Sequence, residues 1–237
     1  MYVGVDSCPA GWIAISGCSA GLAYAVFHSI DELVRAHESA ELILLDIPIG
    51  LPSAAFPARP CDGLARRFLG RRASSVFSAP CRKAAHSGSI AEARATNLAE
   101  LGVSLSAQAW GICDKIAEVD AFLQSRHHGS PRVREMHPEI CFWSLNGGHP
   151  MRHAKKTKAG AAERLMLLDA IDPRAGGLCR QVLAETLRRD VQRDDILDAL
   201  IGCLTAMGCC TGELSKFIGV PAHDALGLPM EMVFRTL

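Results

Sequence analysis

The sequence predicts an α/β domain built around a mixed five-stranded sheet. Three short apolar segments follow one another in the first thirty residues, and turn-rich stretches separate them. A fourth apolar segment ends in an aspartate, and helical patterns fill most of the rest of the chain. These observations favour a three-strand antiparallel meander joined to parallel strands, with helices on both faces.

The first strands are expected at residues 2–6, 12–16 and 22–27, with turns at 8–11 and 17–21. The pair Ser29 and Glu32 has the spacing of a capping box, which predicts a short helix over residues 30–36. Residues 41–46 are apolar almost throughout and end at Asp46. Such a run is typical of a strand that is buried on both sides.

Prolines, glycines and arginines are frequent after Asp46, and they predict an Arg-rich insertion at about residues 51–105. Within it, a helical turn or two is expected at 65–69. Ser89 and Glu92 predict a helix that stops near Gly102. Ser106 is expected to cap a longer helix that continues through Phe122.

Residues 133–136 and 140–142 flank the sequence His137-Pro138-Glu139, and together they are interpreted as a last strand interrupted by the proline. The remainder is expected to be mainly helical, at 161–170, 178–188 and 194–207. No repeat or linker divides the chain, so residues 1–237 are expected to form one domain of ribonuclease H-like arrangement. A dinucleotide-binding fold fits less well, because no G-x-G-x-x-G motif follows the first strand.

Composition limits the function classes. Lysine plus arginine and aspartate plus glutamate both count 25, so the protein lacks the overall positive charge of a nucleic-acid coat protein. A polyanion would have to meet a local patch, such as the arginine-rich stretch 59–83. The ten cysteines are scattered, without a C-x-x-C pair, and are expected to be thiols. No apolar run reaches the about 20 residues of a membrane span. We therefore expect a cytoplasmic protein that does not enter a membrane.

Aspartates close two of the predicted strands. Asp6 ends the first strand and Asp46 ends the fourth, and turn residues follow each. If the two strands are neighbours, both carboxylates emerge at one edge of the sheet, where a cation can offset their repulsion. Aspartates that merely form turns are the alternative, because aspartate is common at strand ends.

The last long helix adds further acids. Asp195 and Asp198 lie one turn apart, so both can face the same ion, while the apolar residues of this helix form a buried stripe. Asp194 could replace Asp195. Acids in a first helical turn also stabilise the helix through its macrodipole, so a capping role remains open.

Glu139 is a further candidate, either as a ligand or as a base near the metal, because it lies in a turn-like interruption. His137 could take part in acid–base chemistry or be structural.

The chain resembles a known family, the domain-of-unknown-function family 429, whose members are predicted nucleases with a ribonuclease H-like fold. The resemblance runs nearly from end to end. It is carried by these blocks: Gly4-Val5-Asp6 with Gly11-Trp12, Asp46-Ile47-Pro48-Ile49-Gly50-Leu51, Cys61-Asp62 with Ala65-Arg66, residues 69–77, residues 115–120, residues 134–139 and residues 194–200. It implies carboxylates at Asp6, at Asp46 and in the last long helix. The D-x-x-D-A spacing from Asp195 is similar to that of Holliday-junction resolvases.

Carboxylates in this arrangement favour two-metal hydrolysis of a phosphodiester, with Mg²⁺ or Mn²⁺ as the cofactor and nucleic acid as the substrate. Asp6, Asp46, Asp195 and Asp198 would be the metal ligands. Phosphate contacts are expected from the side chains of the insertion, because guanidinium groups bind phosphate in a bidentate way and hydroxyls donate: Arg71, Arg72, Ser74, Ser75 and Arg82.

Two other functions remain open. The protein could be a non-catalytic module that binds a nucleotide or a partner protein. Alternatively, the fold could support a metal-dependent phosphohydrolase or transferase for a small metabolite, because fold alone does not fix the reaction.

Overall fold

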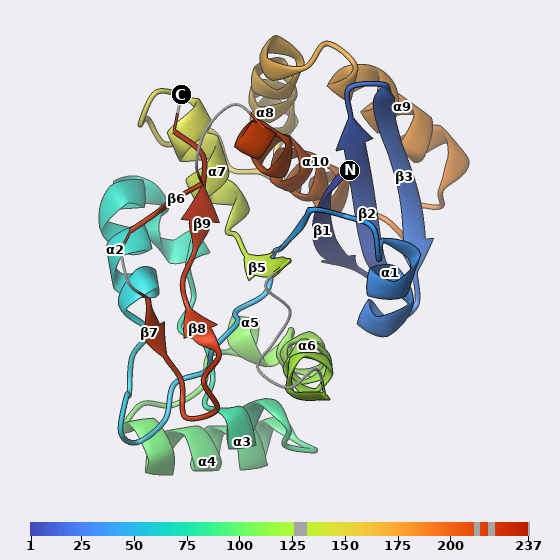
Figure 1. Ribbon diagram of the computed structural model, residues 1–237. Helices are drawn as coiled ribbons and strands as arrows, with labels where there is room; N and C mark the ends of the chain where they lie inside the picture. The colour runs from blue at the N-terminus through green and yellow to red at the C-terminus, as the bar shows by residue number, and fades with distance from the viewer. Residues whose placement is uncertain (126–131, 211–213, 218–220, 237) are drawn as a thin grey trace. The chain divides into compact units, whose positions relative to one another are not determined.

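The computed structural model describes residues 1–125, 132–210, 214–217 and 221–236 (Figure 1). Internal contacts divide the chain into two compact units. The first contains Met1–Asp46, Pro131–Ser215 and Val233–Leu237, and the second contains Ile47–Ser130 and Lys216–Met232. The second unit starts directly after Asp46. It includes the insertion predicted at residues 51–105 and extends beyond it.

A mixed sheet forms the centre of the first unit. Its strands are β1 (Tyr2–Cys8), β2 (Gly11–Cys18), β3 (Gly21–Phe27), β4 (Leu42–Leu45) and β5 (Val133–Glu135), in the order β3-β2-β1-β4-β5. The first three pair antiparallel, as the predicted meander. β4 runs parallel to β1, and β5 runs parallel to β4. The α/β class and the mixed five-stranded sheet are thereby confirmed.

Helix α10 (Arg193–Met207) covers one face of this sheet and packs most closely against β1 (Figure 1). Gly4 permits the close approach, since a Cβ at this position would lie 2.0 Å from the backbone nitrogen of Cys203 and 2.2 Å from the oxygen of Ala199. Residues two apart in a strand share a face, so Asp6 points to the same side as Gly4. The strand therefore presents Asp6 toward α10.

Helix α1 (Ile30–Ala36) covers the opposite face. Trp12 is adjacent in β2 to the residue that pairs with Asp6, so Trp12 and its cross-strand partner Phe27 point away from α10. The Phe27 ring makes an edge-to-face contact with His37, the C-cap residue of α1, with 5.6 Å between ring centroids. Helices thus lie on both faces, as predicted, and Trp12 is fully buried on the face opposite to α10.

The segment after β5 is helical, so the prediction of a strand at residues 140–142 is wrong. Helix α7 (Pro138–Leu145) has Pro138 in its first turn. There the fixed φ of proline suits the helix, and its missing N–H is not needed. A short buried apolar run fits a helix as well as a strand, which explains the error. Helices α8 (Lys158–Ile171) and α9 (Ala175–Glu185) follow close to their predicted positions.

The second unit is mostly helical. It contains α2 (Pro60–Leu69), the 3₁₀ helix η1 (Gly70–Ser75), α3 (Arg82–Ala85), α4 (Ile90–Leu101), α5 (Ala107–Trp110) and α6 (Cys113–Ser125). Ser89 caps α4, and Gly102 ends it in the left-handed conformation, as predicted. The single helix expected from Ser106 to Phe122 is wrong, because the chain breaks at Gly111. Glycine has a low helix propensity, which favours the break.

The C-terminal part contains short strands, so the prediction of a mainly helical remainder is wrong beyond α10. The described elements are η2 (Gly208–Cys210), β6 (Ser215–Lys216), β7 (Ala222–His223), β8 (Pro229–Met230) and β9 (Val233–Phe234). The strands have two residues each, which is too short for a period-2 pattern to be visible in the sequence.

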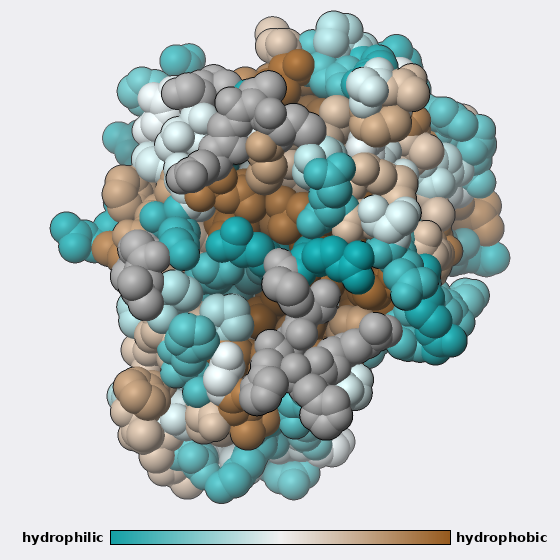
Figure 2. Space-filling view, in the orientation of Figure 1, coloured by the Kyte–Doolittle hydropathy of each residue, from teal (hydrophilic) through white to brown (hydrophobic). Residues whose placement is uncertain are grey.

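Hydrophilic and apolar side chains are interspersed on the face seen in Figure 2. Large apolar side chains that are exposed, such as Phe68, Leu98 and Met166, are distributed over different helices. Within the described residues, no helix combines the length and the apolar character that crossing a membrane requires.

Candidate metal centre

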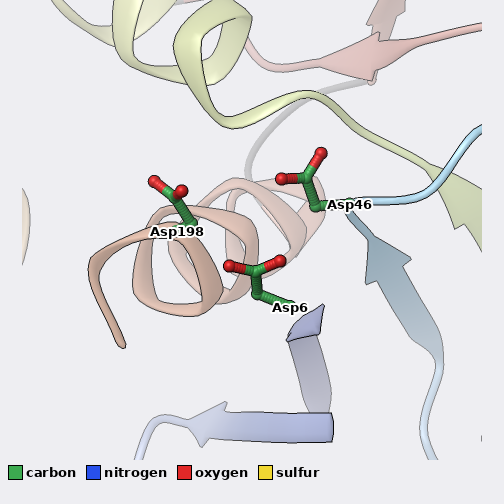
Figure 3. A group of neighbouring side chains, drawn as sticks. All are labelled: Asp6, Asp46 and Asp198. Carbon is green, nitrogen blue, oxygen red and sulfur yellow. The ribbon is translucent and has the colours of Figure 1, made fainter. Parts of the chain in front are cut away.

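Three aspartates from distant parts of the sequence meet beside α10 in the first unit. Asp6 lies in β1, Asp46 directly follows β4, and Asp198 lies in the second turn of α10. The three side chains lie next to one another, with Asp6 between Asp46 and Asp198 in this view (Figure 3). Each offers one carboxylate oxygen, and these oxygens all lie within 4.8 Å of one another. Among the His, Cys, Asp and Glu residues that the structure describes, these three form a group that could hold a metal ion.

Strand register explains why Asp6 and Asp46 meet. Val5 pairs with Leu45 across the parallel strands, so the next residue of each strand reaches the same level and the same face. The backbone N–H of Asp46 donates to the oxygen of Val5 at 3.0 Å, which extends the ladder by one bond. The Gly4 contact with Ala199 then holds α10 close enough for Asp198 to reach both acids.

Burial and mutual repulsion both disfavour the ionised forms of these acids. Desolvation raises the pKa of Asp6 well above its ordinary value, and the charges of Asp46 and Asp198 raise it further. Desolvation and the charge of Asp198 raise the pKa of Asp46 to about 8. The pKa of Asp198 is also raised, chiefly by burial. A cation at the centre would relieve both effects.

Lys155 supplies one positive charge to this cluster. Its Nζ donates to Asp198 Oδ2 at 2.7 Å, and the negative charges of Asp198, Asp6 and Asp46 raise the pKa of the lysine. The Asp198 side chain is 1% exposed and that of Lys155 is 38% exposed, so part of the lysine side chain reaches the surface while its ammonium binds a buried carboxylate. One ammonium opposes three carboxylates, which leaves the cluster with a negative balance if all are ionised.

The donor set fits a divalent metal. Carboxylate oxygens are the ligands that Mg²⁺ and Mn²⁺ prefer. Asp198 Oδ1 is buried and has no hydrogen-bond donor within the described part of the chain. A buried carboxylate oxygen in that state normally costs free energy, which an ion would recover.

Asp195 is not among the three aspartates whose oxygens lie within 4.8 Å of one another. Asp195 Oδ2 accepts a hydrogen bond from the backbone nitrogen of Gln192 at 2.8 Å, within a capping box at the start of α10. Burial raises the pKa of Asp195 to about 6, with further contributions from Asp194 and Asp198. Asp195 therefore combines a capping contact with a position near Asp198, and Asp194 is half-buried in the same turn.

Glu139 is buried near the cluster in an ion pair that the sequence did not indicate. Its Oε1 accepts from Arg164 Nη2, and both side chains are almost fully buried. Arg164 also donates to the oxygens of His153 and Gly160, and it lies over the Phe142 ring. The negative charge of Glu139 also contributes to the raised pKa values of Asp46 and Asp198.

The expected phosphate-binding residues all lie in the second unit. Arg71 and Ser74 are exposed, whereas Arg72 and Ser75 are half-buried and the Ser75 hydroxyl donates to the oxygen of Arg72 at 2.7 Å. Arg82 binds two acids of the same unit, with 2.8 Å from its Nε to Asp120 Oδ2 and a further bond from Nη2 to Asp224. Its guanidinium is thus already engaged by carboxylates.

Two of the cluster's neighbours, Lys155 and Arg164, were missed in the sequence. Lys155 belongs to the basic run of residues 152–158, which contains no acid, and this run was the available signal. Arg164 lies in an ordinary helical pattern, and nothing in the sequence marks it as buried.

Residues 4–223 match a family model described as "Protein of unknown function (DUF429)". The chain belongs to the DUF429 family. The matched segment includes Asp6, Asp46, Asp198 and Lys155, so the whole cluster falls within the DUF429 region. Neither the curated proteins nor the solved structures contain a significant match to the chain.

Proposed function

We propose that this protein is a divalent-metal-dependent nuclease of the ribonuclease H-like class, which hydrolyses phosphodiester bonds with Mg²⁺ or Mn²⁺ as cofactor. The observation that carries the proposal is the convergence of Asp6, Asp46 and Asp198 on one point. The strand order supports the fold assignment, because a three-strand meander followed by parallel strands is the arrangement expected of this class.

The three carboxylates would hold the metal, with Asp198 Oδ1 as the ligand atom that now lacks a donor among the described residues. A bound ion supplies Lewis-acid activation of water and stabilises negative charge on the phosphoryl group. Asp195 and Glu139 lie near these ligands and could serve in the same reaction as a second-metal ligand or a base.

Lys155 has a separate role in the proposal. It neutralises part of the carboxylate charge before the ion arrives, through its bond to Asp198. Its side chain is 38% exposed, so Lys155 links the buried acids to the surface from which a phosphate would arrive. The lysine thus lowers the electrostatic barrier to bringing a polyanion next to three acids.

The direct test compares the native protein with Asp6→Asn on single-stranded DNA, duplex DNA, RNA and branched DNA, each with Mg²⁺ and with Mn²⁺. We expect cleavage by the native protein and a loss of more than about 100-fold in the variant, because a ligand is removed without a change of shape. Glu38→Gln, an exposed acid on the first unit, is the control and should keep full activity.

Two outcomes would overturn the nuclease proposal. Cleavage that is unchanged in Asp6→Asn would separate the activity from this site. Metal-dependent hydrolysis of small phosphate esters without cleavage of any polynucleotide would instead support the phosphohydrolase alternative.

A further inference from the structure

We propose that residues 152–158, which comprise the end of the loop between α7 and α8 and the first residue of α8, bind the phosphate backbone of a polynucleotide and lead it to the three carboxylates; this segment is called the loop below. This inference builds on the proposed function. It names the surface that the substrate would occupy, and it assigns that surface to the first unit.

The loop has an unusual charge for a protein with equal numbers of acids and bases. In seven residues it contains Arg152, Lys155, Lys156 and Lys158, together with His153 and no acid. Arg152, Lys156 and Lys158 are exposed. Their side chains form no ion pair with any acid in the described ranges, so their charges are available to a ligand.

Contacts from α8 fix the shape of this loop. The Glu163 carboxylate accepts from the backbone nitrogens of Arg152 and His153 at 2.8 and 3.0 Å. The buried Arg164 donates to the oxygen of His153 at 3.1 Å. Because buried and half-buried side chains hold the backbone, the exposed cations project from a preorganised support, which lowers the entropy lost on binding.

Glycine at position 160 holds the second half of the loop against α8. A Cβ at Gly160 would lie 2.0 Å from the oxygen of Ala154, so only glycine allows this contact. The Thr157 hydroxyl donates to the same Ala154 oxygen at 2.8 Å and accepts from the Gly160 nitrogen at 3.0 Å. Lys155 and Lys156 lie between Ala154 and Thr157, so these contacts hold the backbone on both sides of the two lysines.

Lys155 connects the loop to the acids. Its bond to Asp198 places the centre of the basic segment directly at the candidate metal ligands. A phosphate chain bound along Arg152, Lys156 and Lys158 would therefore pass the carboxylates. By contrast, Arg82 in the arginine-rich second unit is already bound to Asp120 and Asp224.

A groove beside the loop gives the substrate further room. It has a volume of about 510 Å³ and is lined in part by His149, Arg152, His153, Glu163 and Met166. Two of these residues, Arg152 and His153, belong to the loop. A nucleotide next to a loop-bound phosphate would thus have space for its sugar and base.

The test measures binding separately from cleavage. Fluorescence anisotropy with labelled single-stranded and duplex DNA and with RNA, in Ca²⁺ and in the Asp6→Asn background, reports affinity without turnover. The test variant is Arg152→Gln/Lys156→Gln/Lys158→Gln. The matched control is Arg180→Gln/Arg188→Gln/Arg189→Gln, which removes the same charge from other exposed positions of the first unit.

We expect the loop variant to bind at least about 10-fold more weakly at 0.1 M salt, and the control variant to bind within about 2-fold of the parent protein. The slope of log affinity against log salt should become less steep by about 2 for single strands and about 3 for duplexes, since three phosphate contacts are lost.

Equal affinity of loop variant and parent, an equal loss in the control variant, or no polynucleotide binding by the parent would each overturn the proposal. Its failure is distinguishable from failure of the nuclease function. Polynucleotide binding that depends on the loop, without any cleavage, would support the role of the loop and contradict the nuclease proposal. Cleavage that does not depend on the loop would support the nuclease proposal and contradict the role of the loop.

Discussion

Asp6 and Asp46 stand level on neighbouring parallel strands, one residue beyond the paired residues Val5 and Leu45. They would repel each other if both were ionised, and burial adds to that cost. Proteins place buried like charges together chiefly where a ligand or a proton compensates them. The metal-free and metal-bound proteins should therefore respond oppositely to pH.

The first prediction concerns metal affinity and pH. Ligand carboxylates must be deprotonated, and the pKa of Asp46 is raised to about 8. We expect the apparent affinity for Mn²⁺, measured by titration calorimetry, to rise steadily from pH 6 to pH 8 and to level off above that range. An affinity that is constant over this range would mean that Asp46 is not a ligand.

The second prediction concerns stability without metal. A carboxyl group whose pKa is higher in the folded than in the unfolded state favours folding below its unfolded pKa, and this contribution is lost as the pH rises through the folded value. The metal-free protein should thus lose stability from about pH 4 to pH 8. Asp46→Asn should raise its Tm at pH 8 by at least about 3 °C, measured by calorimetry, whereas Glu38→Gln should leave it unchanged.

The third prediction separates the two acids of α10. Asp198 lies within the cluster, whereas Asp195 accepts from the Gln192 nitrogen. Asp198→Asn should reduce Mn²⁺ affinity by more than about 100-fold, and Asp195→Asn should reduce it by less than about 10-fold. Titration calorimetry of both variants at pH 8 decides this. A larger effect of Asp195→Asn would assign the ligand to Asp195.

The fourth prediction concerns the contact between β1 and α10. Gly4→Ala would force a Cβ against the backbone of Cys203, so we expect a loss of about 2–3 kcal/mol in the free energy of unfolding. Gly21→Ala is the matched strand control, because no atom lies within 4 Å of its Cβ position. Urea unfolding measures both. Equal stability of the two variants would show that β1 and α10 can separate without cost.

The fifth prediction concerns the buried pair of Glu139 and Arg164. Arg164→Met removes the guanidinium that forms an ion pair with the buried Glu139 carboxylate and should cost about 3–5 kcal/mol. The double variant Glu139→Leu/Arg164→Met should lose less than the single one. Additive losses in urea unfolding would show that the two side chains do not depend on each other.

The positions of the three clustered aspartates could be predicted, because these residues follow simple patterns in the sequence. Asp6 and Asp46 lie at the ends of apolar strand segments, and Asp198 lies among the buried apolar residues of α10. Strand order then follows from the meander and the crossover. Each of these patterns lies within a single strand or helix, so it can be recognised without knowledge of the tertiary contacts.

Other features depend on contacts that the sequence does not encode locally. The bond of Lys155 to Asp198 joins residues 43 positions apart, and Arg164 reaches Glu139 across 25 positions. The helix that begins at Pro138 is a different case. It could have been predicted from the sequence, since proline suits a first helical turn. The two-residue strands near the C-terminus could not be predicted, because they are too short to show an alternation of apolar and polar residues.

The most direct test of the account is a crystal structure of the protein soaked in Mn²⁺ at pH 8, with the ion located by its anomalous scattering. We predict a peak about 2.0–2.5 Å from carboxylate oxygens of Asp6, Asp46 and Asp198. A crystal soaked to saturation in Mn²⁺ that shows no anomalous peak among these three side chains, or a peak only elsewhere, would contradict the account.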